Sequence, residues 1–560
     1  MSLTQITTLL LLAAPLAAQT VGGQSQILRA IDSPKLLDGF GDSISNRGDL
    51  NGDGFDDILI GAYSTDFGNS QDVGAAYAVS GADGTLLYQW DGVNAGDNFG
   101  IAVAYAGDVN NDGVEDVIIG ARWTTSPSGR SQAGSANVYS GATGLLLYQW
   151  HGQSTSDWFG SSVAGAGDVN QDGFEDVIVG AVGADSPGLP STGSVYVYSG
   201  ADGSQLYKWT GTQLSDQFGF TVAAAGDLNA DGFADVVAGT SQSTPGVLGR
   251  VMVYSGVDGS VLYQFDPSTA VSGFGTSIDM LGDVNADGTI DFILGERNEN
   301  SGGLFGNGSA TVYSGLDGSV LYKLFGENSF DGFGASVSRA GDINQDGYDD
   351  FLINADAINL GGLSDTGAVY LYSGADGTLM HRFDGQFQGS FFGRSISGGG
   401  DVNADGLPDL LIWQPQPTIM IADVVTVFSF HPFLAADAPT LSAATGGTLN
   451  FTLDFPGSAA FYDYKVILSG AGNGPTFFGV NIPLTLDGLV VDSFLGNYPA
   501  PNTNMHGTLD SAGNASASLT APANLPPAMI GKTFHLAAIA NPSGQLPEYS
   551  SVAVSVTVLP

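Results

Sequence analysis

Residues 99–121 read FGIAVAYAGDVNNDGVEDVIIGA, and variants of this stretch occur seven times in the chain. Each copy has a Phe-Gly pair, an acid-rich loop that begins nine residues after the Phe, and an apolar run. A period this regular indicates a repeat architecture, in which each unit is one supersecondary structure. The first acids of the loops, spaced by 59, 60, 59, 56, 59 and 59 residues, are Asp49, Asp108, Asp168, Asp227, Asp283, Asp342 and Asp401.

Each repeat unit offers four short β-strands separated by turn signals. In the third unit, the Phe-Gly strand is followed by VIVG (177–180), VYVYSG (195–200), a tight ADG turn and QLYKW (205–209). Apolar runs bounded by Gly, Asp and Asn are typical of strands joined by hairpins. Seven four-stranded units predict an all-β fold, a seven-bladed β-propeller, because radial repetition protects the sheet edges. A linear β-solenoid is the alternative, but its coils are shorter than this repeat.

The two ends of the repeat region complement each other. The seventh unit has strands at 392–397, 409–413 and 424–430, but no fourth strand follows them. Residues 26–32, QILRAID, precede the first Phe-Gly pair and align with the missing strand. We therefore expect this N-terminal strand to complete the last blade, which closes the ring and removes an open sheet edge.

The composition is that of an ordered, acidic β protein. Of the 560 residues, 83 are Gly and 43% are hydrophobic, while 57 acidic and 14 basic residues give a net charge of −43. Strong acidity accompanies disorder only when the hydrophobic content is low, which is not the case here. The charge excludes a nucleic-acid binder that relies on a basic surface. The absence of Cys excludes a disulfide scaffold.

All seven acid-rich loops follow the pattern Asp-x-Asn-x-Asp-Gly-x-x-Asp. In the second unit the pattern comprises Asp108, Asn110, Asp112 and Asp116, and Gly113 permits the sharp turn. Calcium takes six to eight oxygen ligands, which carboxylates at alternating positions of a tight loop can supply together with a backbone carbonyl. The loop begins like an EF-hand, but its twelfth position is apolar in every copy. The ninth-position Asp is therefore expected to be the closing ligand.

These loops predict up to seven structural Ca²⁺ ions, with a plain Asx-rich hairpin turn as the alternative. The seventh loop position would contribute its backbone carbonyl, whatever its side chain. The predicted ligands are Asp49, Asn51, Asp53, Phe55 and Asp57; Asp108, Asn110, Asp112, Val114 and Asp116; Asp168, Asn170, Asp172, Phe174 and Asp176; Asp227, Asn229, Asp231, Phe233 and Asp235; Asp283, Asn285, Asp287, Thr289 and Asp291; Asp342, Asn344, Asp346, Tyr348 and Asp350; and Asp401, Asn403, Asp405, Leu407 and Asp409.

The flanking regions differ from the repeats. Residues 5–18, QITTLLLLAAPLAA, form an apolar run that is too short to span a bilayer and predicts a signal peptide over 1–18, with a buried first strand as the alternative. Because other apolar stretches are shorter still and no Cys could carry a lipid anchor, we expect a secreted or cell-surface protein without membrane insertion. The propeller would then occupy 19–433.

In residues 434–560 the acid-rich loops stop, and about seven short apolar or alternating segments are separated by Gly, Pro and Asn. This pattern predicts a β-sandwich of the immunoglobulin-like type. Its role as a spacer, a surface-attachment module or a binding module is left open by the sequence.

The Phe-Gly pair, the acid-rich loop and the following Gly-Ala resemble the FG-GAP repeat of the integrin α-subunit propeller. The resemblance covers residues 25–432, and the presence of the loop in every unit points to a bacterial-type secreted protein. It implies that the cation loops lie on one face and that ligands bind the other face, built from the loops between second and third strands and those linking blades. It does not imply the integrin's partner subunit. Later units depart from Gly-Ala at Gly239-Thr240, Gly295-Glu296, Asn354-Ala355 and Trp413-Gln414.

No catalytic motif stands out in the chain. None of the five His lies in an HExxH pattern, and no Gly-x-Ser-x-Gly elbow stands between a strand and a helix. The sequence therefore favours a noncatalytic binding or adhesion module for a protein or carbohydrate outside the cell. A polysaccharide lyase or hydrolase on a propeller scaffold stays open, because a pair of carboxylates would suffice for glycoside hydrolysis. A structural component of a surface or matrix is the other alternative.

The loops after the second strand are long and differ between units, and variable loops on a rigid scaffold often carry binding. Trp123 lies in such a loop and Trp158 in a connection between blades. Both should open on the face away from the cations, where Trp123 and Trp158, with Arg122 and Arg130, are the candidate ligand-binding residues. Burial of the two indoles at a blade junction is the alternative. The tryptophans of the fourth strands are expected to pack instead; they are Trp90, Trp150 and Trp209.

Overall fold

A computed structural model describes residues 21–432, except 36–37, 68–69, 242–248, 268–272 and 416–421, and beyond 432 little more than a set of strands. The expected signal peptide, 1–18, lies outside the described residues. In the described part of the chain, no helix has the length and apolar character needed to cross a membrane.

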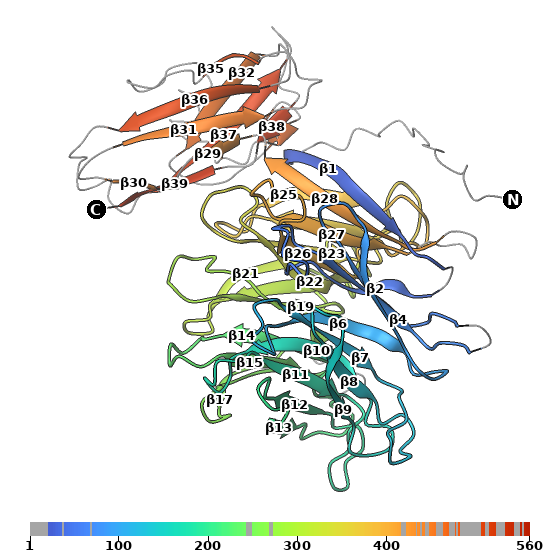
Figure 1. The fold of residues 1–560 in the computed structure, drawn as a ribbon. Helices are drawn as coiled ribbons and strands as arrows, with labels where there is room; N and C mark the ends of the chain where they lie inside the picture. Colours follow the sequence, from blue (N-terminus) through green and yellow to red (C-terminus); the bar gives the residue numbers. More distant parts are fainter. Residues whose placement is uncertain are drawn as a thin grey trace, which may run out of the picture.

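Six antiparallel four-stranded sheets and a seventh four-stranded blade, which is part of a larger sheet, form a closed ring (Figure 1). The inner strands contact one another in the order β2, β6, β10, β14, β18, β22 and β26, and β26 contacts β2 again. The seven-bladed propeller is thereby confirmed. The blades are, in order, β2 (Phe40–Ser45), β3 (Ile58–Ala62), β4 (Ala75–Val79), β5 (Leu86–Asp91); β6 (Phe99–Gly107), β7 (Asp116–Ala121), β8 (Ser135–Tyr139), β9 (Leu146–His151); β10 (Phe159–Gly167), β11 (Asp176–Ala181), β12 (Ser194–Tyr198), β13 (Gln205–Thr210); β14 (Thr221–Gly226), β15 (Asp235–Gly239), β16 (Val251–Tyr254), β17 (Val261–Phe265); β18 (Phe274–Met280), β19 (Phe292–Glu296), β20 (Ser309–Tyr313), β21 (Val320–Phe325); β22 (Phe333–Gly341), β23 (Asp350–Ala355), β24 (Ala368–Tyr372), β25 (Leu379–Asp384); and β26 (Ile396–Gly400), β27 (Asp409–Gln414), β28 (Val424–Pro432), β1 (Val21–Asp32).

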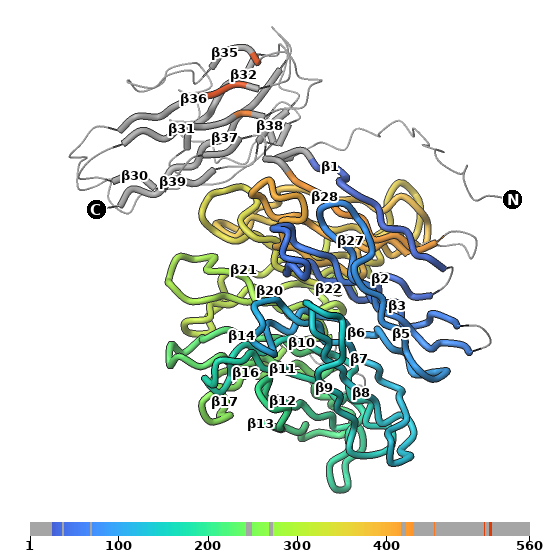
Figure 2. Tube along the Cα trace, in the orientation of Figure 1, coloured from blue at the N-terminus to red at the C-terminus, as the bar shows by residue number. Residues whose placement is uncertain are grey.

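Strand β1 closes the ring, as the sequence predicts. It pairs antiparallel with β28 from Gly23 opposite Pro432 to Asp32 opposite Val424, so the two ends of the repeat region share blade 7. Figure 2 follows the chain around the ring and back to the seventh blade. The inner strand of this blade, β26, begins later than the expected residue 392.

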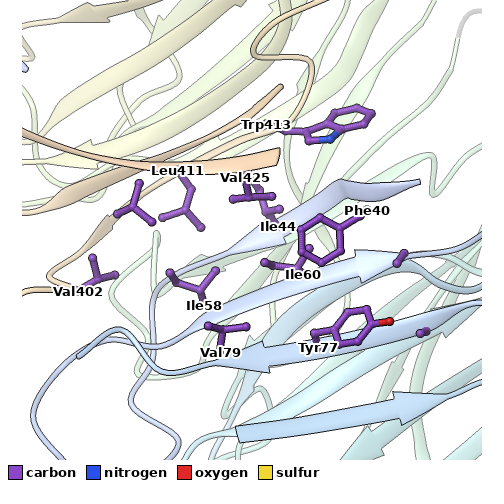
Figure 3. Packing of buried hydrophobic residues seen from close by; sticks show 13 residues of the cluster. Phe40, Ile44, Ile58, Ile60, Tyr77, Val79, Val402, Leu411, Trp413 and Val425 are labelled. Atoms are coloured by element: carbon purple, nitrogen blue, oxygen red, sulfur yellow. The ribbon is translucent and has the colours of Figure 1, made fainter. Parts of the chain in front are cut away.

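Trp413 replaces the usual Gly at the junction of blades 7 and 1 (Figure 3). Its buried indole packs with Val425 against Phe40 and Ile60 of blade 1. Because the indole occupies this space, a Cβ on Gly41 would lie 2.4 Å from its Cδ1 atom. The departure from Gly-Ala in this unit therefore fills the junction at which the ring closes with an indole ring.

The Phe-Gly and Gly-Ala pairs meet where neighbouring blades touch. A Cβ on Gly120 would lie 2.1 Å from the carbonyl oxygen of Gly160 in the next blade. A Cβ on Gly160 would in turn lie 2.2 Å from the carbonyl oxygen of Ser135. Both glycines are required because real Cβ atoms cannot approach backbone so closely, and Phe159 fills the space beside them with its ring buried. In blade 6, Asn354 replaces the Gly and donates to the facing carbonyl of Gly393 at 2.7 Å.

The outer strands attach each blade to the turn of the next. Tyr148 donates its hydroxyl to the carbonyl of Gly200 at 2.8 Å, and the Trp150 indole donates to Gly203 at 2.9 Å. Trp150 also stacks on Tyr198 of the next blade, with ring centroids 4.6 Å apart. The packing role expected for the fourth-strand tryptophans is therefore confirmed. In β1 the position of Tyr148 is taken by Arg29.

Arg29 makes the same kind of attachment from blade 7 to blade 1. Its guanidinium donates to the carbonyl oxygens of Ser80 at 2.8 Å and Gly81 at 2.9 Å. A long cationic side chain can satisfy two carbonyl groups at once. The terminal strand thus supplies both the missing sheet ladder and the missing contact between blades.

An ion pair also links blades that are not neighbours. The Arg47 guanidinium, just after β2, donates to the Asp279 carboxylate of β18 at 3.2 and 2.5 Å. Arg47 Nε donates to the carbonyl of Gly398 in blade 7 at 2.7 Å. Both charged side chains keep partial exposure, so the pair is a modest stabiliser that fixes the position of the inner strands.

Beyond residue 432 the described strands are β29 (Leu434–Ala436), β30 (Thr440–Ser442), β31 (Gly447–Asp454), β32 (Asp463–Ser469), β33 (Thr476–Phe477), β34 (Val480–Asn481), β35 (His506–Thr508), β36 (Asn514–Ala521), β37 (Thr533–Asn541), β38 (Tyr549–Ser551) and β39 (Val554–Leu559). Strands β29, β31 and β36 form one sheet, and β38, β37, β32 and β35 continue from β1. The immunoglobulin-like sandwich and the domain boundaries stay predictions.

Blade 5 carries a buried pair of carboxylates where its Gly-Ala becomes Gly-Glu. Glu296 and Glu299 are almost fully buried, and Lys323 Nζ lies 3.5 Å from Glu296 Oε2 and 2.9 Å from Glu299 Oε2. Burial, together with the neighbouring Glu299, raises the pKa of Glu296 to about 8 despite the ammonium group. Hydrogen bonds with Glu296, Ser309 and Lys323 hold the pKa of Glu299 below its usual value against the effect of burial. The protonated Glu296, together with Ser309 and Lys323, therefore keeps Glu299 charged.

We predict that Glu296 makes the folding stability depend on pH. Its folded-state pKa lies above the usual 4.5, so its contribution is present at low pH and is lost as the pH rises towards about 8. The Glu296→Gln variant should lack this loss because Gln has no proton to release. Urea unfolding of both proteins between pH 5 and 9 tests this, and parallel stability profiles would contradict it.

We predict that removing residues 19–32 destabilises the propeller far more than removing 436–560. The first truncation exposes the edge of β28 and removes the Arg29 contacts, whereas the second leaves the ring closed. Loss of this ladder should cost on the order of 5 kcal/mol or more, at about 1 kcal/mol per backbone hydrogen bond. Thermal unfolding of the two truncated proteins provides the measurement. Equal midpoints, or normal stability of the first protein, would reject closure by β1.

Candidate functional site

The acid-rich loops and the turns between third and fourth strands lie on one face of the ring. This follows because consecutive strands of each blade are antiparallel, as in the ladder from β6 to β9. The loops between second and third strands and the connections between blades therefore lie on the opposite face, as expected. The two faces can serve different roles.

The first and fifth side chains of each loop cap the loop's own backbone, and the third does so in every blade except blade 2. In blade 1, the Asp49 carboxylate accepts from the N–H groups of Gly52 at 2.7 Å and Gly54 at 2.8 Å. The Asn51 side-chain oxygen accepts from Asp53 N–H at 2.9 Å. In all seven loops, the sixth-position Gly donates its N–H to the first-position Asp. The pattern thus holds a compact turn with oxygens at alternating positions.

The ninth-position Asp ties the loop to the neighbouring turn. In blade 3, fully buried Asp176 accepts from Val169 N–H at 2.9 Å and from Gly200 N–H at 3.0 Å. A Cβ on Gly200 would lie 2.0 Å from the carbonyl oxygen of Glu175, which explains why Gly follows the Tyr-Ser of this turn. The first six blades have one such bond from the loop and one from the turn, although in blade 2 the loop donor is Asn110 N–H, one position later. Their ninth-position acids are all completely buried: Asp57, Asp116, Asp176, Asp235, Asp291 and Asp350.

Blade 7 satisfies its ninth-position acid differently. Asp409 accepts from Val402 N–H at 3.0 Å, and the Ser429 side chain forms a hydrogen bond with it. The blade lacks the turn because β28 runs on to Pro432, with Phe430 where other blades have Gly. The acid therefore stays buried and hydrogen-bonded even where its second backbone partner is missing.

The loop carboxylates repel one another. Burial raises the pKa of Asp176 to about 7, and the charges of Asp172 and Asp168 also raise it. The effect is strongest in blade 6, where burial and neighbouring loop acids raise the pKa of Asp346 to about 7 and that of Asp350 well above its usual value. No basic side chain is among the main influences on these three acids. A divalent cation would supply the missing positive charge, so the donor set fits one.

The loop side chains are not gathered around a single point. Within the described residues, no group of three or more His, Asp or Glu side chains has the arrangement of a metal site. In six blades the ninth-position carboxylate makes two backbone bonds, and with about four lone-pair sites it could serve both as a cap and as a ligand. The loops thus have suitable chemistry for a cation, and the ligand roles assigned from the sequence stay predictions.

The predicted ligand-binding residues lie on the opposite face. The Arg122 guanidinium lies 5.0 Å from the ring centre of half-buried Trp123. Exposed Arg130 donates to the Ser128 hydroxyl at 2.8 Å. Trp158 is half-buried, and a Cβ on Gly183 of blade 3 would lie 3.1 Å from its ring. Their role in binding stays a prediction.

The same face carries a pocket that the sequence analysis missed. Its volume is about 460 Å³, and it lies over blades 4 to 7. The sequence feature that could have indicated this pocket is the residue directly after each Phe-Gly pair, which differs from unit to unit. Residues that define the pocket are Phe220, Thr276, Arg297, Asp356, Phe391 and Arg394.

Comparison with known proteins agrees with this architecture. A family model of the FG-GAP repeat matches residues 40–79, 159–198, 218–254 and 333–372. The chain carries FG-GAP repeats. These matches fall in blades 1, 3, 4 and 6, and the remaining blades repeat the same strand order.

The FG-GAP propeller is similar to integrin α-subunits. The chain is 26% identical to integrin alpha-5 of Xenopus laevis over 350 residues, which cover 59% of this chain and 27% of that protein. It is 31% identical to integrin alpha-V of Gallus gallus over 208 residues, covering 35% and 20%. The match to integrin alpha-IIb of Mus musculus is 34% over 164 residues, covering 27% and 16%. The chain thus spans less than a third of the length of these relatives.

Among solved structures, the chain described as "Structure of Dos1 propeller" aligns with a TM-score of 0.38 and 12% identity, covering 69% of this chain and 77% of that one. A likeness this weak supports no conclusion about this chain. The integrin α-like FG-GAP propeller therefore rests on the repeats, the relatives and the closed ring of seven blades.

We predict that the ninth-position acids stabilise the FG-GAP blades without a cation. The Asp176→Ala variant leaves two buried N–H groups without an acceptor, and each unsatisfied group costs about 1 to 3 kcal/mol. The loss of unfolding free energy in EDTA should therefore be about 3 kcal/mol. The matched control is Asp202→Ala, which removes an exposed acid from the turn of the same blade. Similar losses for both variants would contradict the role of the buried acid.

Proposed function

We propose that the protein is an exported, calcium-binding FG-GAP propeller that acts as a noncatalytic binding or adhesion module. The observation that carries this proposal is the separation of the two faces. Near-identical acid-rich loops occupy one face, whereas loops of differing length and sequence gather on the other. Variable loops on a rigid scaffold are where binding usually resides.

Calcium would act in this protein as a structural ion. The loops offer carboxylate, amide and carbonyl oxygens, which are the ligands that Ca²⁺ prefers. Extracellular calcium modules commonly have dissociation constants of about 10⁻⁴ to 10⁻³ M, a range that suits an exported protein. In a chain without Cys, cations and ring closure would take the place of disulfides.

The ligand would be a protein or a carbohydrate outside the cell. The integrin relatives favour a protein ligand, since they share the propeller type. A carbohydrate is favoured by the aromatic and arginine side chains on the variable face. The C-terminal region would serve as a spacer or attachment module built as a β-sandwich.

We predict that chelation lowers the thermal midpoint and that calcium restores it. A site filled at 100 times its dissociation constant contributes about 2.7 kcal/mol. Scanning calorimetry with and without EDTA, with metal analysis of both samples, gives the result. An unchanged midpoint after proven removal of the metal would exclude structural calcium. Asp231→Ala should reduce bound calcium by one ion per chain, whereas Asp258→Ala, an exposed turn acid of the same blade, should not.

The binding role is tested by applying the calcium-loaded protein to arrays of glycans and matrix proteins, followed by analysis for released products. Retention without product is the expected result. Release of cleaved glycan would support the enzyme alternative instead. Self-association with no retained ligand would support a structural component.

A further inference from the structure

One position of the repeat contributes a residue from each of blades 4 to 7 to the pocket. The residues directly after the Phe-Gly pairs of these blades are Phe220, Thr276, Ala335 and Arg394, and all four line the pocket. This position begins the inner strand on the face opposite the acid-rich loops. The pocket therefore lies beside the propeller axis, on the face that carries the variable loops.

Two arginines give the pocket a positive charge in a very acidic protein. Arg297 Nη2 lies 2.9 and 3.0 Å from the two carboxylate oxygens of Asp356, so this arginine is paired and held in place. Arg394 is exposed. Burial raises the pKa values of Asp42 and Asp356, and the positive charge of Arg394 lowers them. Among the described residues, the ion pairs do not include Arg394. An anionic group is therefore the natural partner of its guanidinium.

Two phenyl rings flank these charges. Phe220 is 42% exposed although it is a large apolar side chain. Phe391, directly before the Phe-Gly pair of blade 7, also lines the pocket. Its φ of +45° lies in the left-handed region, as it does at this position in the other blades, whatever the residue. The two aromatic side chains thus supply the apolar part of the pocket lining.

The ligand must match both a cation and apolar rings. Guanidinium groups bind planar carboxylates with two parallel hydrogen bonds. The C–H face of a pyranose ring can pack against phenyl rings, and a volume of about 460 Å³ accommodates a sugar residue with room for its linkage. The carboxylate of an acidic amino acid would satisfy Arg394 but would leave the rings largely uncovered.

We propose that this pocket binds a carboxylate-bearing sugar residue of the uronic-acid class. Arg394 binds the carboxylate, and Phe220 and Phe391 pack against the ring. Arg297, held by Asp356, donates to the ring hydroxyls. This inference rests on the proposed binding function and names its ligand class.

The test is isothermal titration calorimetry of the calcium-loaded protein with methyl β-D-glucuronide and methyl α-D-galacturonide. At least one uronide should bind saturably, and methyl β-D-glucoside, which lacks the carboxylate, should bind at least tenfold more weakly. Arg394→Gln should weaken uronide binding at least tenfold. The matched control, Lys208→Gln, removes an exposed cation from the outer strand of blade 3, away from the pocket, and should leave binding unchanged. Equal thermal midpoints of the two variants show that both are folded.

The Phe220→Ala variant distinguishes a site that binds an acidic sugar from a site that binds any carboxylate. It should weaken binding of the uronide severalfold and leave binding of N-acetylaspartate, a peptide-like acid, unchanged. Wild-type binding of N-acetylaspartate as tight as that of the uronide would overturn the proposal in favour of an acidic peptide. Absence of uronide binding, or unchanged binding by Arg394→Gln, would also overturn it. If arrays still retain the protein in that case, only the pocket assignment fails, whereas loss of all retention rejects the proposed function.

Discussion

A buried carboxylate joins the two halves of every blade. The ninth-position Asp, such as Asp176, accepts one N–H from its own loop and, in six blades, another from the turn after the third strand. It therefore connects the hairpin of the inner strands to the hairpin of the outer strands on one face of the ring. Because the carboxylate is fully buried, its removal would leave two backbone N–H groups without an acceptor. The contact persists although the loop between its partners varies in length, from 21 residues of separation in blade 4 to 25 in blade 2.

The contacts between blades depend on equally local features. Gly120 and Gly160 let two backbones touch, and the outer strands reach the next turn through Tyr148 and Trp150. Each blade thereby presents the same edge to its successor. The ring closes through the same kinds of contact. Strand β1, from the other end of the chain, supplies the fourth strand that the seventh unit lacks, and its Arg29 supplies the contact to blade 1.

Much of this fold could be predicted from the sequence because its determinants recur at fixed intervals. The repeat revealed the strands, the blade number and the closing strand 26–32, and the recurrence of Trp at the position of Trp150 indicated packing. The capping role of Asp176 could not be foreseen, because its partner Gly200 becomes a neighbour only once the blade has folded. The pocket escaped notice for a similar reason, since Arg297 and Arg394 come from different blades. The pair Glu296 and Glu299 was visible only as a departure from the motif.

The central claim is that the ninth-position acids hold the blades together and also close the cation sites. It is tested most directly by crystal structures of the protein grown in calcium and in EDTA. The account predicts an ion in the loops at about 2.3 to 2.6 Å from the ninth-position carboxylates, which keep their bonds to Gly200 and its equivalents in both structures. Carboxylates that leave these backbone N–H groups when the ion binds, or loops that stay empty in calcium, would contradict it.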